Sequence, residues 1–298
     1  MIRHLLGTTV ALLLAGALFS VLERRWPALR GRSWWHRRGH LTDLAYWFLG
    51  PLVIQPIVKA ATVAAVVLVA LALGAPLGAG RLQPWIEARR TVVSLQPGWL
   101  QAIEIILLAD LLGYWTHRLF HRRRLWRFHA VHHAAKELDW LSAVRVHPVN
   151  EALMRVAQIV PLFALGFRGE ALAGVAPLFT LYALGLHANV PWTFGRLRHL
   201  LASPAFHRWH HTSEEQGLDK NFAGLFPVWD LVFGTFYLPV DRQPVTFGVR
   251  EEVPAGLLAQ LAWPLAPLGP PAARTALTAS PSPASPPRTP PDPPRAPA

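Results

Sequence analysis

The distribution of apolar residues predicts several long helices that cross or enter a membrane. Residues 5–22 form the first apolar stretch, close to the roughly 20 residues that one membrane crossing needs. No small-residue cleavage site follows it, and the adjacent basic residues lie on its far side, so we expect an uncleaved helix rather than a signal peptide. Residues 41–75 exceed the length of one crossing, and Pro51 and Pro56 predict a kinked or partly interfacial segment.

A third apolar stretch, residues 99–121, differs from the others because it contains ionisable side chains. Asp110, Tyr114, His117 and His121 recur at i, i+4, i+7 and i+11, so they form one stripe along a helix. An ionisable group within a membrane segment is energetically costly and usually faces a bundle interior or a site. The stripe therefore predicts that this helix faces a functional site.

The rest of the pattern predicts a helical hairpin, a mixed segment and a tail. Residues 151–166 and 171–187 are apolar and are separated by Phe167-Arg168-Gly169, whereas residues 188–240 are mixed in polarity. From about residue 264 onward the chain is rich in Pro, Ala, Ser and Arg without an apolar period, so we expect disorder there. These elements predict an all-α integral membrane protein: a bundle of about four to five transmembrane helices with a cytoplasmic, helical, histidine-rich metal-site cap.

The positions of the arginine residues predict the orientation of the chain in the membrane. Residues 24–40 and 122–145 are the two loops richest in Arg, which indicates that both are cytoplasmic. Residues 41–75 must then cross once and residues 99–121 must return, while the hairpin of residues 151–187 goes out and back. The histidines near the ends of these segments, from His117 to His133 and from His187 to His211, are thereby expected at one membrane face. We expect an integral membrane protein, in a bacterial inner membrane, whose metal site faces the cytoplasm.

The composition limits the kinds of site that the chain can build. Of its 298 residues, 52% are hydrophobic and none is Cys. Disulfides, thiolate zinc sites, iron–sulfur clusters and cysteine-ligated haem are therefore excluded, and any metal must be held by nitrogen and oxygen ligands. The formal net charge of +12 comes almost entirely from Arg and indicates cytoplasmic loops and contact with anionic headgroups. No nucleic-acid-binding motif is present, so we expect no nucleic-acid partner.

Histidines at ligand spacing are the most informative chemical feature. Eleven of the 14 histidines lie between His117 and His211. Positions i, i+3 and i+4 share a helix face, so closely spaced histidines can aim two or three imidazoles at one point. An H-x3-H pair and two H-x2-H-H triplets show this spacing: His117 and His121; His129, His132 and His133; and His207, His210 and His211. Because one metal ion uses about four ligands, these eight histidines predict two metal ions side by side.

For the remaining polar residues, the spacing in the sequence does not decide between a structural role and a role at the metal site. His187 ends an apolar helix and His147 precedes Pro148, so spacing alone does not make either a ligand. His199 is expected on a solvated basic face, and His4, His36 and His40 in basic membrane flanks. Four polar residues near the motifs are expected to orient the ligands by accepting from imidazole N–H groups: Asp110, Asp219, Asn221 and Asp230. For Asp219, Asn221 and Asp230 the alternative is a role in turn formation or capping.

Several motifs, taken together, resemble one enzyme family. They are Asp110-Leu-Leu-Gly-Tyr-Trp-Thr-His-Arg-Leu-Phe-His121, Leu125-Trp-Arg-Phe-His-Ala-Val-His-His133, Arg145-Val-His-Pro148, Pro204-Ala-Phe-His-Arg-Trp-His-His211, Asp219-Lys-Asn-Phe222 and Trp229-Asp-Leu-Val-Phe-Gly-Thr235. In order and spacing, these segments resemble the fatty acid hydroxylase superfamily, also called the sterol desaturase family. The resemblance covers roughly residues 100–240. We expect three parts: membrane-anchoring helices and loops in residues 1–98, a catalytic domain in residues 99–240 that carries the resemblance, and a Pro-rich C-terminal extension in residues 241–298.

The resemblance implies a function and a cofactor. It implies an integral membrane di-iron enzyme with two Fe ions and with O2 as co-substrate. Such an enzyme hydroxylates or desaturates a membrane lipid, which is a fatty acyl chain, a sterol or a related lipid, with external electrons. No strand followed by G-x-G-x-x-G and no fused haem domain is present, so a separate ferredoxin, cytochrome or reductase is implied as the electron donor. By position, the implied metal ligands are His117, His121, His129, His132, His133, His207, His210 and His211, joined by His187 and His147, which match further family histidines.

Two functions from other classes also fit the residues. A membrane zinc-dependent hydrolase would use the same imidazoles, because zinc accepts nitrogen ligands but has no redox chemistry. A redox-silent metal and no O2 consumption would favour it. A non-catalytic metal-binding or transport protein would instead carry polar residues in every span, whereas here they concentrate in residues 99–121.

Overall fold

The computed structural model of the chain describes residues 2–31, 36–78 and 80–267. Within these residues the fold is all-helical, and the only β-type pairing is an isolated bridge between Thr212 and Phe247. The described residues up to Pro264 belong to one compact unit. A second unit begins at Leu265, and only residues 265–267 of it are described. The disorder predicted for the tail thus falls almost wholly outside the described residues.

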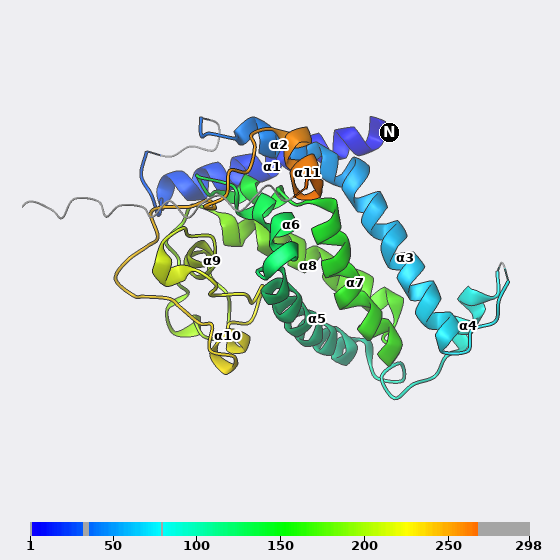
Figure 1. Cartoon of the computed structure of the whole chain (residues 1–298). Helices are drawn as coiled ribbons and strands as arrows, with labels where there is room; N and C mark the ends of the chain where they lie inside the picture. The colour runs from blue at the N-terminus through cyan, green and yellow to red at the C-terminus, as the bar shows by residue number, and fades with distance from the viewer. Residues whose placement is uncertain (1, 32–35, 79, 268–298) are drawn as a thin grey trace, which may run out of the picture. The chain divides into compact units, whose positions relative to one another are not determined.

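Four helices in the described part of the chain are long and apolar enough to cross a membrane. They are α1 (Ile2–Arg25), the continuous run of α2 (His40–Leu49), the π turn η1 (Gly50–Ile54) and α3 (Gln55–Ala72), then α5 (Gly98–Phe120) and α8 (Gly169–His187). They coincide with four of the apolar stretches in the sequence, so the prediction of an all-α membrane protein is confirmed. The short helix α4 (Leu82–Ala88) lies in the connection between α3 and α5 (Figure 1).

The predicted irregularity in the second stretch is a π turn. Pro51 is the second residue of η1. Because proline has no backbone N–H and its ring collides with the preceding turn, the regular hydrogen-bond pattern cannot continue through it. The α2 and α3 segments on either side point in different directions in Figure 1. The kink expected from Pro51 is therefore present, within one continuous helical run.

The predicted hairpin consists of α7 (Pro148–Leu165) and α8. Pro148 occupies the first position of α7, where its missing N–H costs no hydrogen bond. Gly166 ends the helix at φ 96°, a left-handed conformation that favours glycine. α7 packs against α3 and α5, and α8 packs against α5, which forms the bundle seen in Figure 1.

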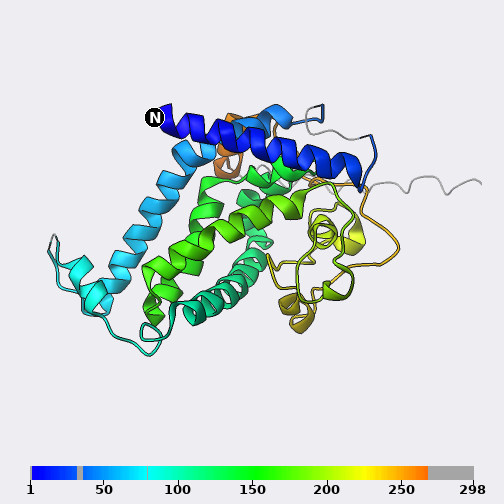
Figure 2. The same ribbon diagram turned by 180° about the vertical axis from the view of Figure 1, so that it is seen from behind.

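α1 does not run parallel to this bundle. Figures 1 and 2 show it crossing obliquely over the ends of α3 and α8. Its Phe19 stacks on Trp140 with ring centroids 5.3 Å apart, and both pack with Leu141 and Leu184 in one apolar cluster. Trp140 and Leu141 are fully buried. α1 therefore covers the segment that follows the first histidine triplet.

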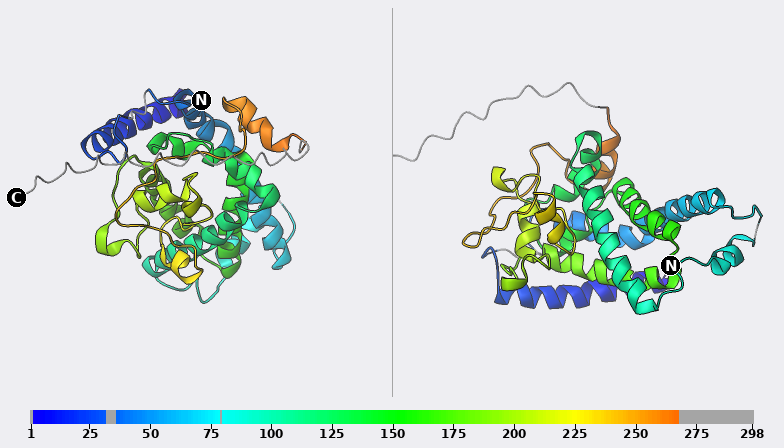
Figure 3. Two further views of the ribbon diagram at one scale, coloured as in Figure 1. Left: turned by 60° about the vertical axis from the view of Figure 1, so that its left-hand side comes forward. Right: turned by 90° about the horizontal axis from the view of Figure 1, so that it is seen from below.

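Short elements gather at the end of the bundle where α5 and α8 finish (Figure 3). They are α6 (Arg123–His133), η2 (Trp140–Val144), η3 (Gly195–Leu197), α9 (Pro204–His210), η4 (Glu215–Gly217), α10 (Val228–Val232) and α11 (Leu257–Ala262), and the 3₁₀ turn η5 (Trp263–Leu265) follows α11. Both histidine triplets belong to this group, at α6 and α9. The fold thus brings the predicted cap to one end of the helices.

A buried network of charges ties the start of α2 to this cap. The Asp43 carboxylate accepts from Arg37 Nη2 and from Arg145 Nε, each at 2.5 Å, and Arg37 also pairs with Asp139. Asp139 caps η2 by accepting from the backbone N–H groups of Leu141 and Ser142. Because four buried charges satisfy one another, the segment from residue 139 to residue 145 is held in one position.

Candidate metal centre

Nine histidines gather in two groups, and in each group the potential ligand nitrogens all lie within 4.8 Å of one another. The first group contains His117, His121, His129, His133 and His210. The second group contains His132, His187, His207 and His211. The rings are buried or partly buried. The two predicted metal positions thus correspond to two sets of imidazoles, with five and four members.

Each histidine triplet is divided between the two groups. On α6, His129 and His133 face the first group and His132 faces the second. At α9 the division is reversed, because the i, i+4 pair of His207 and His211 joins the second group and His210 joins the first. Residues four apart share a helix face, whereas neighbouring residues point about 100° apart. Each triplet therefore contributes its i, i+4 pair to one group and its i+3 residue to the other.

The Nδ1 atoms of six of these rings are hydrogen-bonded to protein oxygens. The pairs are His117 to Phe222 O (2.8 Å), His121 to Asp219 Oδ1 (3.1 Å), His129 to Asn150 Oδ1 (3.1 Å), His132 to Arg145 O (3.0 Å), His187 to Ala183 O (2.8 Å) and His210 to Lys220 O (2.8 Å). An acceptor at Nδ1 keeps the proton on that nitrogen and leaves the Nε2 lone pair free. These rings are therefore fixed in the tautomer and orientation that bind a metal through Nε2.

The Nε2 atoms converge within each group. In the first group, His129 Nε2 lies 2.9 Å from that of His117 and 3.1 Å from that of His133. The second group has three such contacts, between His132 and His187 (3.2 Å), His187 and His207 (3.2 Å), and His207 and His211 (3.1 Å). Lone pairs that face one another at this distance repel unless a proton or a cation lies between them.

Two further nitrogens support a cation at the first group. The buried Nε2 atoms of His121 and His210 have no hydrogen-bond partner in the described part of the chain. A buried polar atom without a partner costs free energy, and coordination to a metal removes that cost. The described residues therefore fit a metal ion held by imidazole nitrogens.

Burial keeps the triplet histidines neutral. It lowers the pKa of His129, His132 and His133 well below the usual value, and neighbouring imidazoles lower it further. The same causes lower the pKa of His210 and His211. Neutral imidazole is the form that coordinates a metal. A donor set made only of imidazoles suits iron, copper, nickel or zinc, whereas magnesium and calcium require oxygen ligands.

The helical stripe predicted on α5 is confirmed, and it faces a loop that holds the site. Asp110 accepts hydrogen bonds from the backbone N–H groups of Leu225 and Phe226, both at 2.8 Å. Tyr114 and Thr235 share a hydrogen bond of 2.9 Å between their hydroxyls. Further along the stripe, His117 and His121 contact Phe222 and Asp219 of the same segment. The segment of residues 219–235 is therefore fastened along α5.

The four polar residues expected to orient ligands act in different ways. Asp219 touches His121 directly, whereas Asp230 accepts from Phe222 N (2.8 Å), Ala223 N (2.9 Å) and the Thr235 hydroxyl (2.6 Å).

Asn221 donates to Phe206 O (2.8 Å) and Tyr237 O (2.7 Å), and Asp110 holds the same segment as described above. Asp219 and Asn221 have positive φ angles of 55° and 60°, which Asp and Asn tolerate better than most residues. Asp110, Asn221 and Asp230 thus position the backbone carbonyls that accept from His117 and His210.

Sequence reasoning missed Asn150 and the main-chain acceptors. Asn150 lies in the first turn of α7 and accepts from His129. Its signal was present, because it follows Arg145-Val-His-Pro148 by two residues. The carbonyls of Arg145, Ala183 and Lys220 leave no trace in the sequence, since every residue type carries one.

His147 lies outside both groups. Its Nδ1 accepts from Val149 N at 3.1 Å as the N-cap of α7, and its Nε2 contacts the Leu261 carbonyl at 3.0 Å. Both ring nitrogens are therefore occupied by protein partners, and the structure gives this residue a capping position. His199 is exposed and packs on Phe236, in line with the expectation of a solvated face, and His36 and His40 also lie outside the groups.

Comparison with known proteins adds the family. Residues 102–235 match the family model described as fatty acid hydroxylase, and this range includes all nine grouped histidines. The chain carries a fatty acid hydroxylase domain. It is 28% identical to the ornithine lipid hydroxylase OlsE of Rhizobium tropici over 271 residues, which cover 88% of this chain and 77% of that protein. No solved structure matches.

Two further relatives match this chain over about half of its length. Human alkylglycerol monooxygenase is 30% identical over 141 residues, which cover 47% of this chain and 31% of that protein. The very-long-chain aldehyde decarbonylase GL1-1 of Oryza sativa subsp. indica is 32% identical over 157 residues, 48% of this chain and 25% of that protein. The chain thus spans a third or less of the length of these two relatives.

Proposed function

We propose that this protein is a membrane lipid oxygenase whose two histidine groups each hold one iron ion. The observation that carries the proposal is the pair of histidine groups in which Nε2 atoms converge, while protein oxygens hold the Nδ1 atoms of six of the nine rings. Iron bound there would supply the activation of O2 that a strong C–H bond requires. The overall hydroxylation consumes one C–H bond, O2, two electrons and two protons, and it produces one alcohol and one water.

The relatives support a lipid substrate. Their names specify an ornithine lipid, an alkylglycerol and a very-long-chain aldehyde. The four candidate membrane helices place this chain where such molecules dissolve. We propose hydroxylation or desaturation of a membrane lipid at the cytoplasmic face of a bacterial inner membrane. The electrons would come from a separate ferredoxin, cytochrome or reductase, because a chain without Cys cannot hold an iron–sulfur cluster.

The protein's own residues would bind the metal and orient its imidazole ligands. Asn150 and Asp219 hold the Nδ1 atoms of His129 and His121, and Asp230 holds the segment whose carbonyl fixes His117. The four histidines of the second group are all buried, which excludes water from that group. Fixed imidazoles require little rearrangement when the metal changes charge, so the chain would supply a preorganised site rather than acids or bases.

Metal analysis and lipid analysis test the proposal together. We expect about two irons per chain in protein purified from an iron-replete host, as two imidazole groups require. Lipids of the same host, grown in air with 18O2, should gain labelled oxygen or lose two hydrogens. His210→Ala should abolish product and lower the iron content, whereas His199→Ala, a matched exposed histidine, should change neither. Zinc without O2 consumption would contradict the oxygenase and favour the hydrolase. Stable metal without any lipid product would favour a non-catalytic protein.

A further inference from the structure

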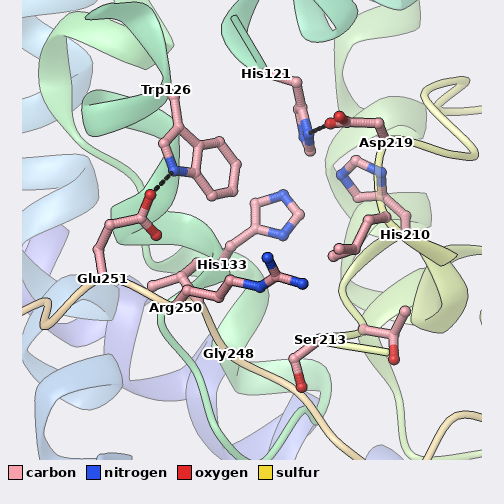
Figure 4. Close-up of a pocket in the computed structure, with 12 residues that line it drawn as sticks. His121, Trp126, His133, His210, Ser213, Asp219, Gly248, Arg250 and Glu251 are labelled. Atoms are coloured by element: carbon pink, nitrogen blue, oxygen red, sulfur yellow. Dashed lines mark hydrogen bonds and ion pairs between the residues drawn. The ribbon is translucent and has the colours of Figure 1, made fainter. Parts of the chain in front are cut away.

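A cavity of about 330 Å³ opens directly onto the first histidine group (Figure 4). His121, His133 and His210 form part of its lining, and no histidine of the second group lines it. The two groups therefore differ in access. Any molecule that enters this cavity comes next to the first group.

Gly248, Val249, Arg250 and Glu251 line the cavity and belong to a strap, which we define as residues 241–256. This strap lies outside the range matched by the family model. Ser213 N donates to Thr246 O (3.0 Å), and Trp126 Nε1 donates to Glu251 Oε1 (2.8 Å). Gly248, between these anchors, has a φ of 104°, a backbone conformation that favours glycine. The strap is thus a built wall with a backbone shape that favours glycine.

The strap places one uncommitted positive charge in the cavity. Arg250 is exposed, and Figure 4 shows its guanidinium pointing into the cavity below the ring of His133. Two acidic residues also line the cavity: Asp219 accepts a hydrogen bond from His121, and Glu251 accepts one from Trp126. Within the described residues no ion pair is formed by Arg250. Its planar fork of N–H groups suits a phosphate or a carboxylate.

The level of the cavity in the membrane indicates the source of such an anion. His121 directly follows the candidate membrane span Gly98–Phe120. The cavity therefore lies where a span ends, which is the depth of lipid headgroups. The acyl chains of a lipid bound there would extend back along the apolar helices, whereas its headgroup would remain at the cavity.

We propose that this cavity binds the anionic headgroup of the lipid substrate, with Arg250 contacting its phosphate or carboxylate. This inference rests on the proposed function. The atoms that occupy the cavity are the ones nearest to the first histidine group. The C–H bond that is oxidised therefore belongs to the headgroup or to the carbons adjoining it, not to the middle of an acyl chain. The reaction consumes O2, two electrons and two protons as above.

The position of the new oxygen tests the inference. Lipids from a host that expresses the full chain under 18O2 are fragmented by mass spectrometry. We expect the label in the fragment that contains the headgroup. Label in the middle of an acyl chain would overturn the inference while leaving the oxygenase intact. A host without any labelled lipid would instead count against the proposed function, and the binding experiment below would still decide the inference.

Binding to the iron-loaded protein without O2 provides the independent measurement. The probes are dihexanoyl phosphatidate and dihexanoylglycerol, which differ only in the phosphate. Arg250→Gln should weaken phosphatidate binding about tenfold or more, the loss typical of a charge-assisted hydrogen bond, and should leave dihexanoylglycerol binding and iron content unchanged. Arg196→Gln, a matched exposed arginine, should alter neither. Equal affinity of Arg250→Gln and the unmodified protein for phosphatidate would overturn the inference. Displacement of phosphatidate by inorganic phosphate at equal concentration would also overturn the inference, because it would show that the cavity binds any anion and does not recognise a lipid.

Discussion

Replacement of Asp230 by Asn separates a structural role from a role in holding the metal. The Asp230 carboxylate is fully buried and accepts three hydrogen bonds, of 2.8 Å from Phe222 N, 2.9 Å from Ala223 N and 2.6 Å from the Thr235 hydroxyl. Oδ1 receives the first and third, and Oδ2 receives the second. Asn keeps the shape but replaces one oxygen by an NH2 group, which cannot accept. At least one buried N–H therefore faces another donor.

The magnitude follows from the lost bond. A hydrogen bond to a charged acceptor contributes roughly 1.5–3 kcal/mol to the free energy of unfolding. A buried donor that is left without an acceptor lowers it by about 1–3 kcal/mol more. Relaxation of the segment recovers part of this, so we expect about 2–4 kcal/mol less stability. The Phe222 carbonyl, which holds His117, belongs to the same peptide unit as the Ala223 N–H, so it moves when that N–H loses its acceptor. Loss of such a support typically lowers metal affinity about 10–100-fold.

Iron affinity and thermal unfolding should be measured on the same membrane preparations. Iron content is followed against increasing chelator, and unfolding is followed with iron bound and removed. Asp241→Asn, at an exposed aspartate, is the matched control. If Asp230→Asn retains iron as tightly as Asp241→Asn, then the segment does not transmit its position to His117 and the reasoning is wrong. Equal product formation per folded protein in both variants would contradict the reasoning in the same way.

Three further outcomes are expected. His147→Ala should keep both irons by elemental analysis and lower the unfolding temperature modestly, because it removes a helix cap worth about 1 kcal/mol. Loss of one iron would show that His147 is a metal ligand. A chain that ends at Pro264 should keep its iron content and lipid product, because both histidine groups and their supports lie before that residue, and a defect in either would assign the tail a structural role. Reporter fusions after Arg38, Gly80 and Lys136 should read cytoplasmic, external and cytoplasmic by the distribution of Arg, and an external reading at Lys136 would contradict the predicted orientation.

The sequence predicted the parts of the site that depend on local periodicity. Spacing identified the pair and the triplets, and the stripe on α5 correctly identified the side of the helix that faces the site. Both patterns repeat within a few residues on one helix, so helical geometry alone determines which side chains share a face. The hairpin of α7 and α8 was likewise visible, because two apolar runs are separated by a short polar turn.

The parts that escaped prediction depend on contacts between distant segments. Spacing did not reveal that His133 and His210 would share one group, since their helices meet only through the tertiary fold. The motif around His147 predicted a metal ligand, but both of its ring nitrogens contact the backbone, at Val149 and Leu261. Leu261 is 114 residues away in the sequence. The strap beside the first group also carried no recognisable motif. The predicted boundaries at residues 98 and 240 stay predictions.

The division of the α6 and α9 triplets between the two histidine groups makes the two metal positions interdependent. Each of the two triplets donates to both groups, so a displacement of either element removes donors from both positions at once. Occupancy should therefore be nearly all-or-none. We expect iron titration of the metal-free protein to follow a sigmoidal curve, with chains that carry a single ion always scarce. The last step of biosynthesis would then be a concerted capture of two ions by a cap already docked on the ends of α5 and α8.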